Sequence, residues 1–344
     1  MKTVWKMLAV LAVAAAAGTF MPASAKAQSY KAEYRISTVV GVPFPWGLSA
    51  QRWADLVKER TNGRIVMKVY PGASLVGGDQ TREFTAMRQG VIDMAVGSTI
   101  NWSPQVPELN LFSLPFLMPD YKAIDAITAG EPGKKLFETI ASKDIVPLAW
   151  GENGFRELTN SKRAIRAPDD LRGLKIRVVG SPLFNDTFTA LGANPTQMSW
   201  ADAQPALSTG AVDGQENPLT IFTVAKLHTV GQKHVTLWHY VADPLIFAVN
   251  KDVWTSFSAD DQKIVREAAL EAGKYGIEVA RKGVTPQDPS VLRDITGLGV
   301  EIISLSPEQL DAFRKVTRPV YDKWKARIGG DLVAAAEKAV AAGR

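Results

Sequence analysis

Short apolar runs alternate with helical patterns in the first part of this chain, and this alternation restricts the fold more than any other feature. Segments 34–39, 65–70 and 91–96 have the composition of strands. The segments between them have helical patterns that end at Asn62-Gly63 and at Gly90. This strand–helix–strand–helix–strand order predicts a mainly parallel sheet with helices on both faces.

Two loops follow strands of this predicted sheet, in the position where such sheets bind ligands. The first, residues 43–46, ends with Trp46, and the second, residues 97–102, contains Ser98 and Trp102. We expect all three residues in a binding site. For each tryptophan, packing at the base of its loop is the alternative.

The N-terminus has the three parts of a secretory signal peptide. Lys2 and Lys6 precede an apolar stretch over residues 8–18, and small residues suit cleavage after residue 25 or 27. The apolar stretch is too short for a good membrane span, and the chain contains no cysteine for a disulfide, a thiolate site or a lipid anchor. We expect residues 1–25 to be removed and the mature protein to be secreted and free, not inserted in the membrane.

The charge of the chain argues against nucleic-acid binding. The sequence has 40 Lys and Arg against 35 Asp and Glu, a net charge of +5. Removal of Lys2 and Lys6 with the signal peptide leaves 38 against 35, or +3. These charges are interleaved along the chain, whereas a nucleic-acid partner requires a concentrated basic face.

A stretch over residues 171–218 carries the strongest functional signal. Its first part alternates, so that Arg177 projects from the opposite side of a predicted strand to Leu174, Ile176 and Val178. A guanidinium is permanently charged, and its paired N–H donors match a carboxylate. Arg177 is therefore a candidate anchor for an organic acid, with a surface arginine on an edge strand as the alternative.

Two motifs in this stretch resemble a known family in combination. They are Leu171-x-Gly-x-Lys-Ile-Arg177 and Leu207-x-x-Gly-x-Val-Asp-Gly-Gln-Glu-Asn-Pro218. The chain resembles the DctP-type solute-binding proteins of TRAP transporters, over nearly its whole mature length. These are periplasmic receptors that bind organic acids and deliver them to a membrane permease.

The resemblance implies further site residues. Arg156 matches a second ligand-facing arginine, Trp200 an aromatic residue beside the ligand, and Asn217 a ligand-bonding asparagine; Gln215 of the same motif is counted with them. Each role has an alternative. Arg156 could form a hinge salt bridge with an acid such as Glu152, Trp200 could pack at the start of a helix, and Asn217 could cap one.

The family fold implied is α/β with two lobes, each a sheet flanked by helices. We expect residues 30–153 and 243–282 in the first lobe and residues 154–242 and 310–344 in the second, with 283–309 unassigned. Residues 259–282 have helical spacing and would form a helix roughly 36 Å long that spans both lobes.

No catalytic constellation is recognisable. His228, His234 and His239 are close in sequence but do not share a strand face, and no hydrolase, metalloprotease or dinucleotide motif is present. We predict a non-enzymatic receptor without metal or cofactor, whose partners are an organic acid and the TRAP permease. The best ligand by resemblance is a four-carbon dicarboxylate; monocarboxylates, oxo acids and sugar acids are alternatives, as is a periplasmic enzyme or sensor-partner protein on the same fold.

Overall fold

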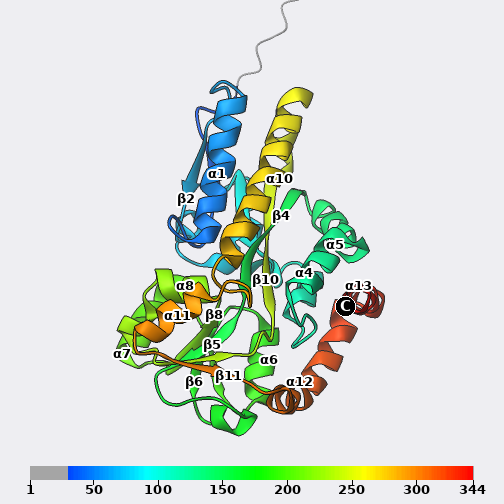
Figure 1. Cartoon of the computed structure of the whole chain (residues 1–344). Coiled ribbons are helices and arrows are strands. Elements are labelled where there is room, and N and C mark those ends of the chain that lie inside the picture. Colours follow the sequence, from blue (N-terminus) through cyan, green and yellow to red (C-terminus); the bar gives the residue numbers. More distant parts are fainter. Residues whose placement is uncertain (1–29, 344) are drawn as a thin grey trace, which may run out of the picture.

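The computed structural model describes residues 30–343 and contains two β-sheets, each flanked by helices (Figure 1). The predicted signal peptide lies outside the described residues. The first sheet has the strand order β2-β1-β3-β10-β4. Its strands are β1 (Tyr34–Ser37), β2 (Met67–Tyr70), β3 (Met94–Ser98), β4 (Ile145–Phe155) and β10 (Ala242–Asn250). The first three are parallel, as the sequence predicts, and β10 runs antiparallel to β3 and β4.

The second sheet has the strand order β11-β9-β5-β8-β6-β7. Its strands are β5 (Glu157–Asn160), β6 (Lys175–Val178), β7 (Asn194–Gln197), β8 (Gly214–Asn217), β9 (His234–Leu237) and β11 (Glu301–Ser304). In β6, Arg177 lies opposite Thr196 of β7 and Gln215 of β8. The two sheets and their helices form the two lobes that the sequence predicts.

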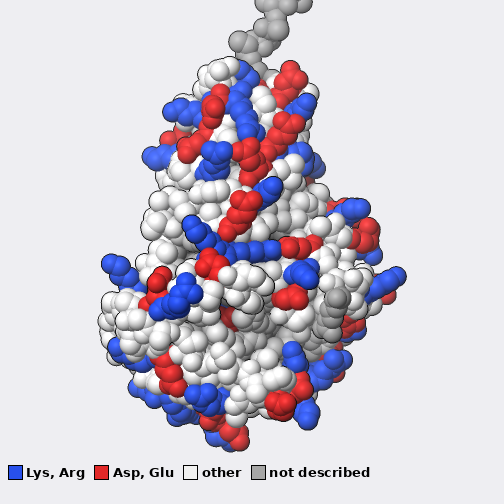
Figure 2. Space-filling model, viewed as in Figure 1, with Lys and Arg blue, Asp and Glu red and all other residues white. Residues whose placement is uncertain are grey.

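Helices cover both sheets. The first lobe carries α1 (Pro45–Arg60), α2 (Glu83–Arg88), α3 (Thr99–Trp102), α4 (Tyr121–Ala129), α5 (Glu131–Ala141), α9 (Lys251–Ser256) and α10 (Ala259–Arg281), with 3-10 turns η1 (Ser74–Val76), η2 (Gln80–Arg82) and η3 (Pro107–Ser113). The second carries α6 (Pro182–Ala190), α7 (Trp200–Thr209), α8 (Leu219–Val224) and α11 (Ser290–Gly297), with η4 (Pro168–Leu171) and η5 (Leu227–Val230). On the face in Figure 2, basic and acidic groups are intermixed. None of the helices among residues 30–343 has the length and apolar character of a membrane span.

The chain crosses between the lobes through adjacent strands. Strand β4 becomes β5 with only Arg156 between them, and residues 238–241 lead from β9 back into β10. The Arg156 backbone N–H donates to the Val241 carbonyl at 3.1 Å, which joins the two crossings. Beside them, the His239 ring lies 2.9 Å from the Glu157 carboxylate.

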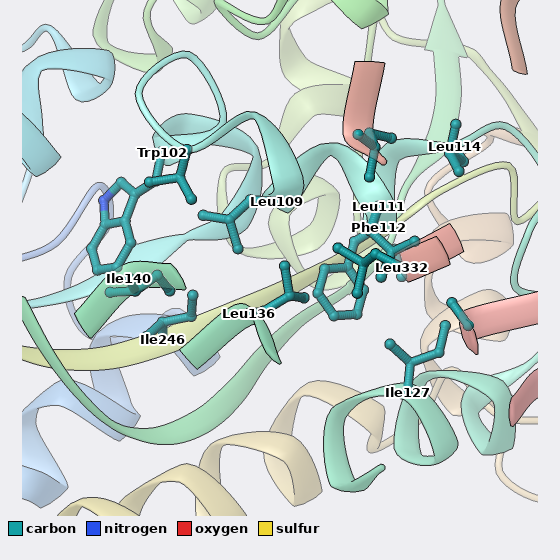
Figure 3. Close-up of a cluster of buried hydrophobic side chains, with 14 of the residues drawn as sticks. Trp102, Leu109, Leu111, Phe112, Leu114, Ile127, Leu136, Ile140, Ile246 and Leu332 are labelled. Atoms are coloured by element: carbon teal, nitrogen blue, oxygen red, sulfur yellow. The ribbon is translucent and has the colours of Figure 1, made fainter. Parts of the chain in front are cut away.

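The C-terminal segment returns to the first lobe. Helix α12 (Pro307–Ile328) packs against α6 of the second lobe and η3 of the first, and α13 (Gly330–Ala342) packs against α4 and α5. Figure 3 shows Leu332 of α13 in one core with Ile127, Leu136 and Ile246 of the first lobe. Residues 310–344, which we expected in the second lobe, are thus divided, and α13 lies with the first lobe. The unassigned residues 283–309 include α11 and β11, which pack in the second.

The expected long helix is α10. Ser258 caps its start by accepting from the Asp261 N–H at 3.1 Å. The helix packs along α1 and β4 of the first lobe (Figure 1). Ala280 in its last turn borders a crevice shared with Pro218 of the second lobe. Two glycines permit this close packing, since a Cβ on Gly273 would lie 2.2 Å from the Trp150 carbonyl oxygen and one on Gly276 would lie 2.7 Å from Ser49 Cβ.

We expect Gly273→Ala to destabilise the first lobe. The added methyl has no room against the β4 backbone, and overpacking of this kind costs about 1–3 kcal/mol, more than the helix propensity that alanine gains. Thermal unfolding followed by circular dichroism measures the change. Gly297→Ala is the matched control because its Cβ would meet open space. A Gly273→Ala protein as stable as the wild type would contradict this account of α10.

The His239–Glu157 pair predicts a pH dependence. Partial burial alone would lower the pKa of His239, but the Glu157 carboxylate outweighs it and raises that pKa above its usual value. The pair therefore stabilises the fold fully below the pKa of an unfolded histidine, about 6.5, and this contribution is lost as the pH rises through the folded pKa. The melting temperature of the wild type should fall more between about pH 6 and 8 than that of His239→Asn. Equal slopes would contradict the prediction.

Candidate functional site

A small cavity lies between the two lobes, at the carboxyl ends of several strands. Its volume is only about 20 Å³, so the lining residues of the two lobes lie close together. Among the residues that we predicted for the site, six line it: Trp46, Ser98, Arg156, Arg177, Trp200 and Asn217. The other lining residues are Val39, Val40, Gln80, Asn101, Asn153, Val179, Ile221 and Asp243. Since β1, β3 and β10 come from one sheet and β6 and β8 from the other, both lobes contribute.

Arg177 is buried, with 1% of its surface exposed. Its Nε and Nη2 donate to the Met198 carbonyl oxygen at 3.0 and 2.7 Å, and its guanidinium lies 5.8 Å from the centre of the Trp200 ring. Among residues 30–343 it makes no salt bridge. Burial lowers the pKa of Arg177 to about 10, so the group is still charged at neutral pH. A buried cation without an acidic partner is suited to an anionic ligand.

Arg156 is equally buried but is already paired. Its Nη2 donates to the side chain and the backbone carbonyl of Glu216 at 2.8 and 2.7 Å, its Nε also donates to the Glu216 carboxylate, and its Nη1 lies 3.2 Å from Asp243. Burial opposes the charge of Arg156, but Glu216 and then Asp243 outweigh it and raise its pKa. The hinge pairing that we considered is therefore present, although with these two acids. Glu152 instead accepts from Arg281 at 2.6–3.2 Å.

The Asn217 side chain is oriented by a chain of amides. Its Nδ2 donates to Gln215 Oε1 at 2.5 Å, and Gln215 Nε2 donates to Thr159 Oγ1 at 2.9 Å. Gln215 is fully buried and lies behind the cavity, outside its lining. Pro218, and not Asn217, takes the N-cap position of α8. Gln215 can therefore act on a ligand only by positioning Asn217.

The three predicted tryptophans lie in different surroundings. Trp46 lines the cavity and donates from Nε1 to the Val96 carbonyl at 2.6 Å, and Trp200 lines it from the first turn of α7. Trp102 does not line it; its indole donates to Glu83 at 3.0 Å and packs in the core of the first lobe (Figure 3). Successive side chains of an α-helix point about 100° apart, and in α3 it is Asn101, not Trp102, that faces the cavity.

Sequence reasoning missed several polar lining residues. Asp243 accepts from Ser98 Oγ at 2.5 Å and from Asn153 Nδ2 at 2.8 Å, and Gln80 Nε2 donates to Asn101 Oδ1 at 2.6 Å. Asp243 and Asn153 belong to the paired crossing strands, so their place beside the hinge was the available signal. Nothing in the sequence around Gln80 indicates its role. Among residues 30–343, no cluster of three or more His, Cys, Asp or Glu side chains could hold a metal.

Comparison with known proteins agrees with this architecture. The family described as bacterial extracellular solute-binding protein, family 7, matches residues 36–327. The C4-dicarboxylate-binding periplasmic protein DctP of Rhodobacter capsulatus is 31% identical over 309 residues, which cover 89% of this chain and 90% of that protein.

Solved structures are also similar. A TRAP periplasmic solute-binding protein from Ralstonia eutropha H16 with bound (S)-2-acetolactate is 66% identical, with a TM-score of 0.90 and coverage of 91% of this chain and 99% of that one. A TRAP periplasmic solute-binding protein from Sulfurospirillum deleyianum with bound succinate is 29% identical, with a TM-score of 0.80 and coverage of 88% and 97%.

The chain therefore belongs to the family 7 extracellular solute-binding proteins, and its two-lobed α/β fold is the fold of the TRAP solute receptors. This confirms the resemblance seen in the sequence motifs. The family consists of binding receptors rather than enzymes, and its characterised relatives bind various organic acids.

Arg177→Ala should weaken the binding of a carboxylate ligand by about 2–5 kcal/mol, or roughly thirtyfold to several thousandfold, because the anion would lose its buried charged partner. Arg177→Lys should restore only part of this, since an ammonium cannot form the paired contact. Calorimetry measures both. Arg314→Ala, a change at a half-exposed arginine outside the cavity, is the control. Binding by Arg177→Ala within about threefold of the wild type would contradict this assignment.

Proposed function

We propose that this protein is secreted to the periplasm, binds a small monocarboxylate with a hydroxyl or oxo substituent between its lobes, and delivers it unchanged to a TRAP membrane permease. The charge of the cavity is the observation that supports a monocarboxylate as the ligand. Arg177 has no acidic partner among the described residues, whereas Arg156 is held by Glu216 and Asp243.

The charge balance favours one carboxylate over two. The described cavity lining contains two cations, Arg156 and Arg177, and one of them is engaged by two carboxylates. A second ligand carboxylate would find no free cation and would meet the negative charge of Asp243 and Glu216. Buried like charges without compensation are costly. A monocarboxylate therefore suits the site better than the four-carbon dicarboxylate that was our first expectation.

The rest of the lining suits a short aliphatic acid that carries oxygen. Four lining residues are buried and apolar: Val39, Val40, Val179 and Ile221. Asp243, on β10 of the first sheet, could accept a hydrogen bond from a ligand hydroxyl. The lining residues leave only about 20 Å³ between them, which favours a short ligand over a long one. The acetolactate bound by the 66% identical relative is such a molecule.

Calorimetry with a panel of acids tests the ligand class. We expect (S)-2-acetolactate to bind at least tenfold more tightly than succinate or galactonate, because succinate adds an unpaired charge and galactonate would bury several hydroxyl groups against the apolar lining. Tighter binding of succinate would restore the dicarboxylate expectation. Asp243→Asn should selectively improve succinate binding if the repulsion argument holds. NMR spectra of the acid before and after incubation with the protein test whether the acid stays unchanged, since any product would indicate an enzyme.

A further inference from the structure

The first turn of helix α7 lacks a cap from its own lobe. Its N-cap residue is Ser199, whose side chain makes no capping hydrogen bond. The backbone N–H groups of a first helical turn have no partner within the helix, and a side-chain acceptor normally satisfies one of them. Here the Trp200 N–H donates to Gln80 Oε1 at 2.9 Å, and Gln80 belongs to η2 of the other lobe.

Gln80 is fixed at its other end as well. Only 5% of its surface is exposed, and its Nε2 donates to Asn101 Oδ1, which lines the cavity. The amide therefore links Asn101 of the first lobe to Trp200 of the second. Trp200 in turn lies over Arg177. The hydrogen bond between Gln80 and Trp200 therefore connects the two lobes, and it does so beside Arg177, the predicted carboxylate anchor.

Thr81, the residue after Gln80, packs against Gly180 of the second lobe. A Cβ on Gly180 would lie 2.7 Å from Thr81 Cγ2, and a Cβ on Gly78 would lie 3.6 Å from Ala201 Cβ. Gly180 has no positive φ, so the contact with Thr81 and not the backbone conformation restricts this position. Gly180 and Thr81 do not line the cavity.

We propose that residues 78–81 form a closing latch, in which Gln80 caps α7 across the cleft and Gly180 provides the space that allows the lobes to meet. The inference rests on the proposed function, since a receptor must open to take up and release its ligand. Opening removes the Gln80 bond and leaves the Trp200 N–H to water, so the latch favours the closed state. A helix cap of usual strength would shift the ratio of closed to open molecules by about threefold to thirtyfold.

Two variants test the latch, and Gly180→Ala separates it from contacts with the ligand because Gly180, unlike Gln80, does not line the cavity. Gln80→Met keeps the side-chain length but removes both hydrogen bonds, and should raise the dissociation rate of (S)-2-acetolactate by about threefold to thirtyfold. Gly180→Ala should have a similar effect without touching the ligand. Thr81→Ser, which removes Cγ2 but retains the hydroxyl bond to Asp79 Oδ1 at 2.7 Å, should restore closure when combined with Gly180→Ala. Gln51→Ala, at an exposed glutamine of α1, is the control.

Distances between the two lobes measure the closure of the protein directly. Because the chain has no cysteine, Lys58→Cys on α1 and Ala190→Cys on α6, both at exposed positions, permit clean attachment of two spin labels. Gln80→Met and Gly180→Ala should shift the distance distribution toward longer values, with and without acetolactate, and the Gly180→Ala/Thr81→Ser protein should return to the wild-type distribution.

The outcomes distinguish the latch from the ligand proposal. If wild-type protein does not bind acetolactate, the proposed ligand fails, and the distances of the ligand-free proteins still test the latch. Distances and dissociation rates that are unchanged in both single variants overturn the latch. A Gly180→Ala effect that Thr81→Ser does not reverse also overturns it, since the contact would then not be the cause.

Discussion

The buried charge of Arg156 is the constraint on which the rest of the site depends. A guanidinium removed from water must be compensated, because an unpaired buried charge costs several kcal/mol. The compensation comes from Glu216 on β8 in the second sheet and Asp243 on β10 in the first. Tyr240 adds a hydrogen bond to Glu216 at 2.8 Å. This ion cluster ties the sheets together at the crossing between the lobes, so the hinge and the site share residues.

The compensation of Arg156 also determines the role of Arg177. Both arginines are buried, yet among the described residues only Arg156 forms salt bridges with acids. The carbonyl oxygen of Met198 orients the Arg177 guanidinium without neutralising it. Two residues of the same type thus have different electrostatic surroundings, and our assignment of Arg177 rather than Arg156 as the ligand anchor rests on that difference.

Features of the fold that depend on neighbouring residues in the chain could be predicted from the sequence. The alternation around Arg177 placed it on a strand, and the order of elements gave the parallel part of the first sheet. Residues whose roles arise from distant contacts were missed. Gln80 is 120 positions from its partner Trp200, and Asp243 is 145 positions from Ser98. Helix α13 packs against α4 and α5 of the first lobe, and a hydrophobic pattern in the sequence does not tell which lobe a helix covers.

The four buried aliphatic residues of the cavity stand apart from the ion cluster. Val39 and Val40 follow β1, Val179 follows β6, and Ile221 lies in α8, whereas the ion cluster of Arg156, Glu216 and Asp243 lies at the crossing between the lobes. Substitutions among aliphatic residues there alter the size of the cavity by single methyl groups, each worth about 0.8 kcal/mol when buried. During evolution such a wall can be remodelled in small steps while the hinge is preserved, so that one scaffold can diversify toward acids of different shape.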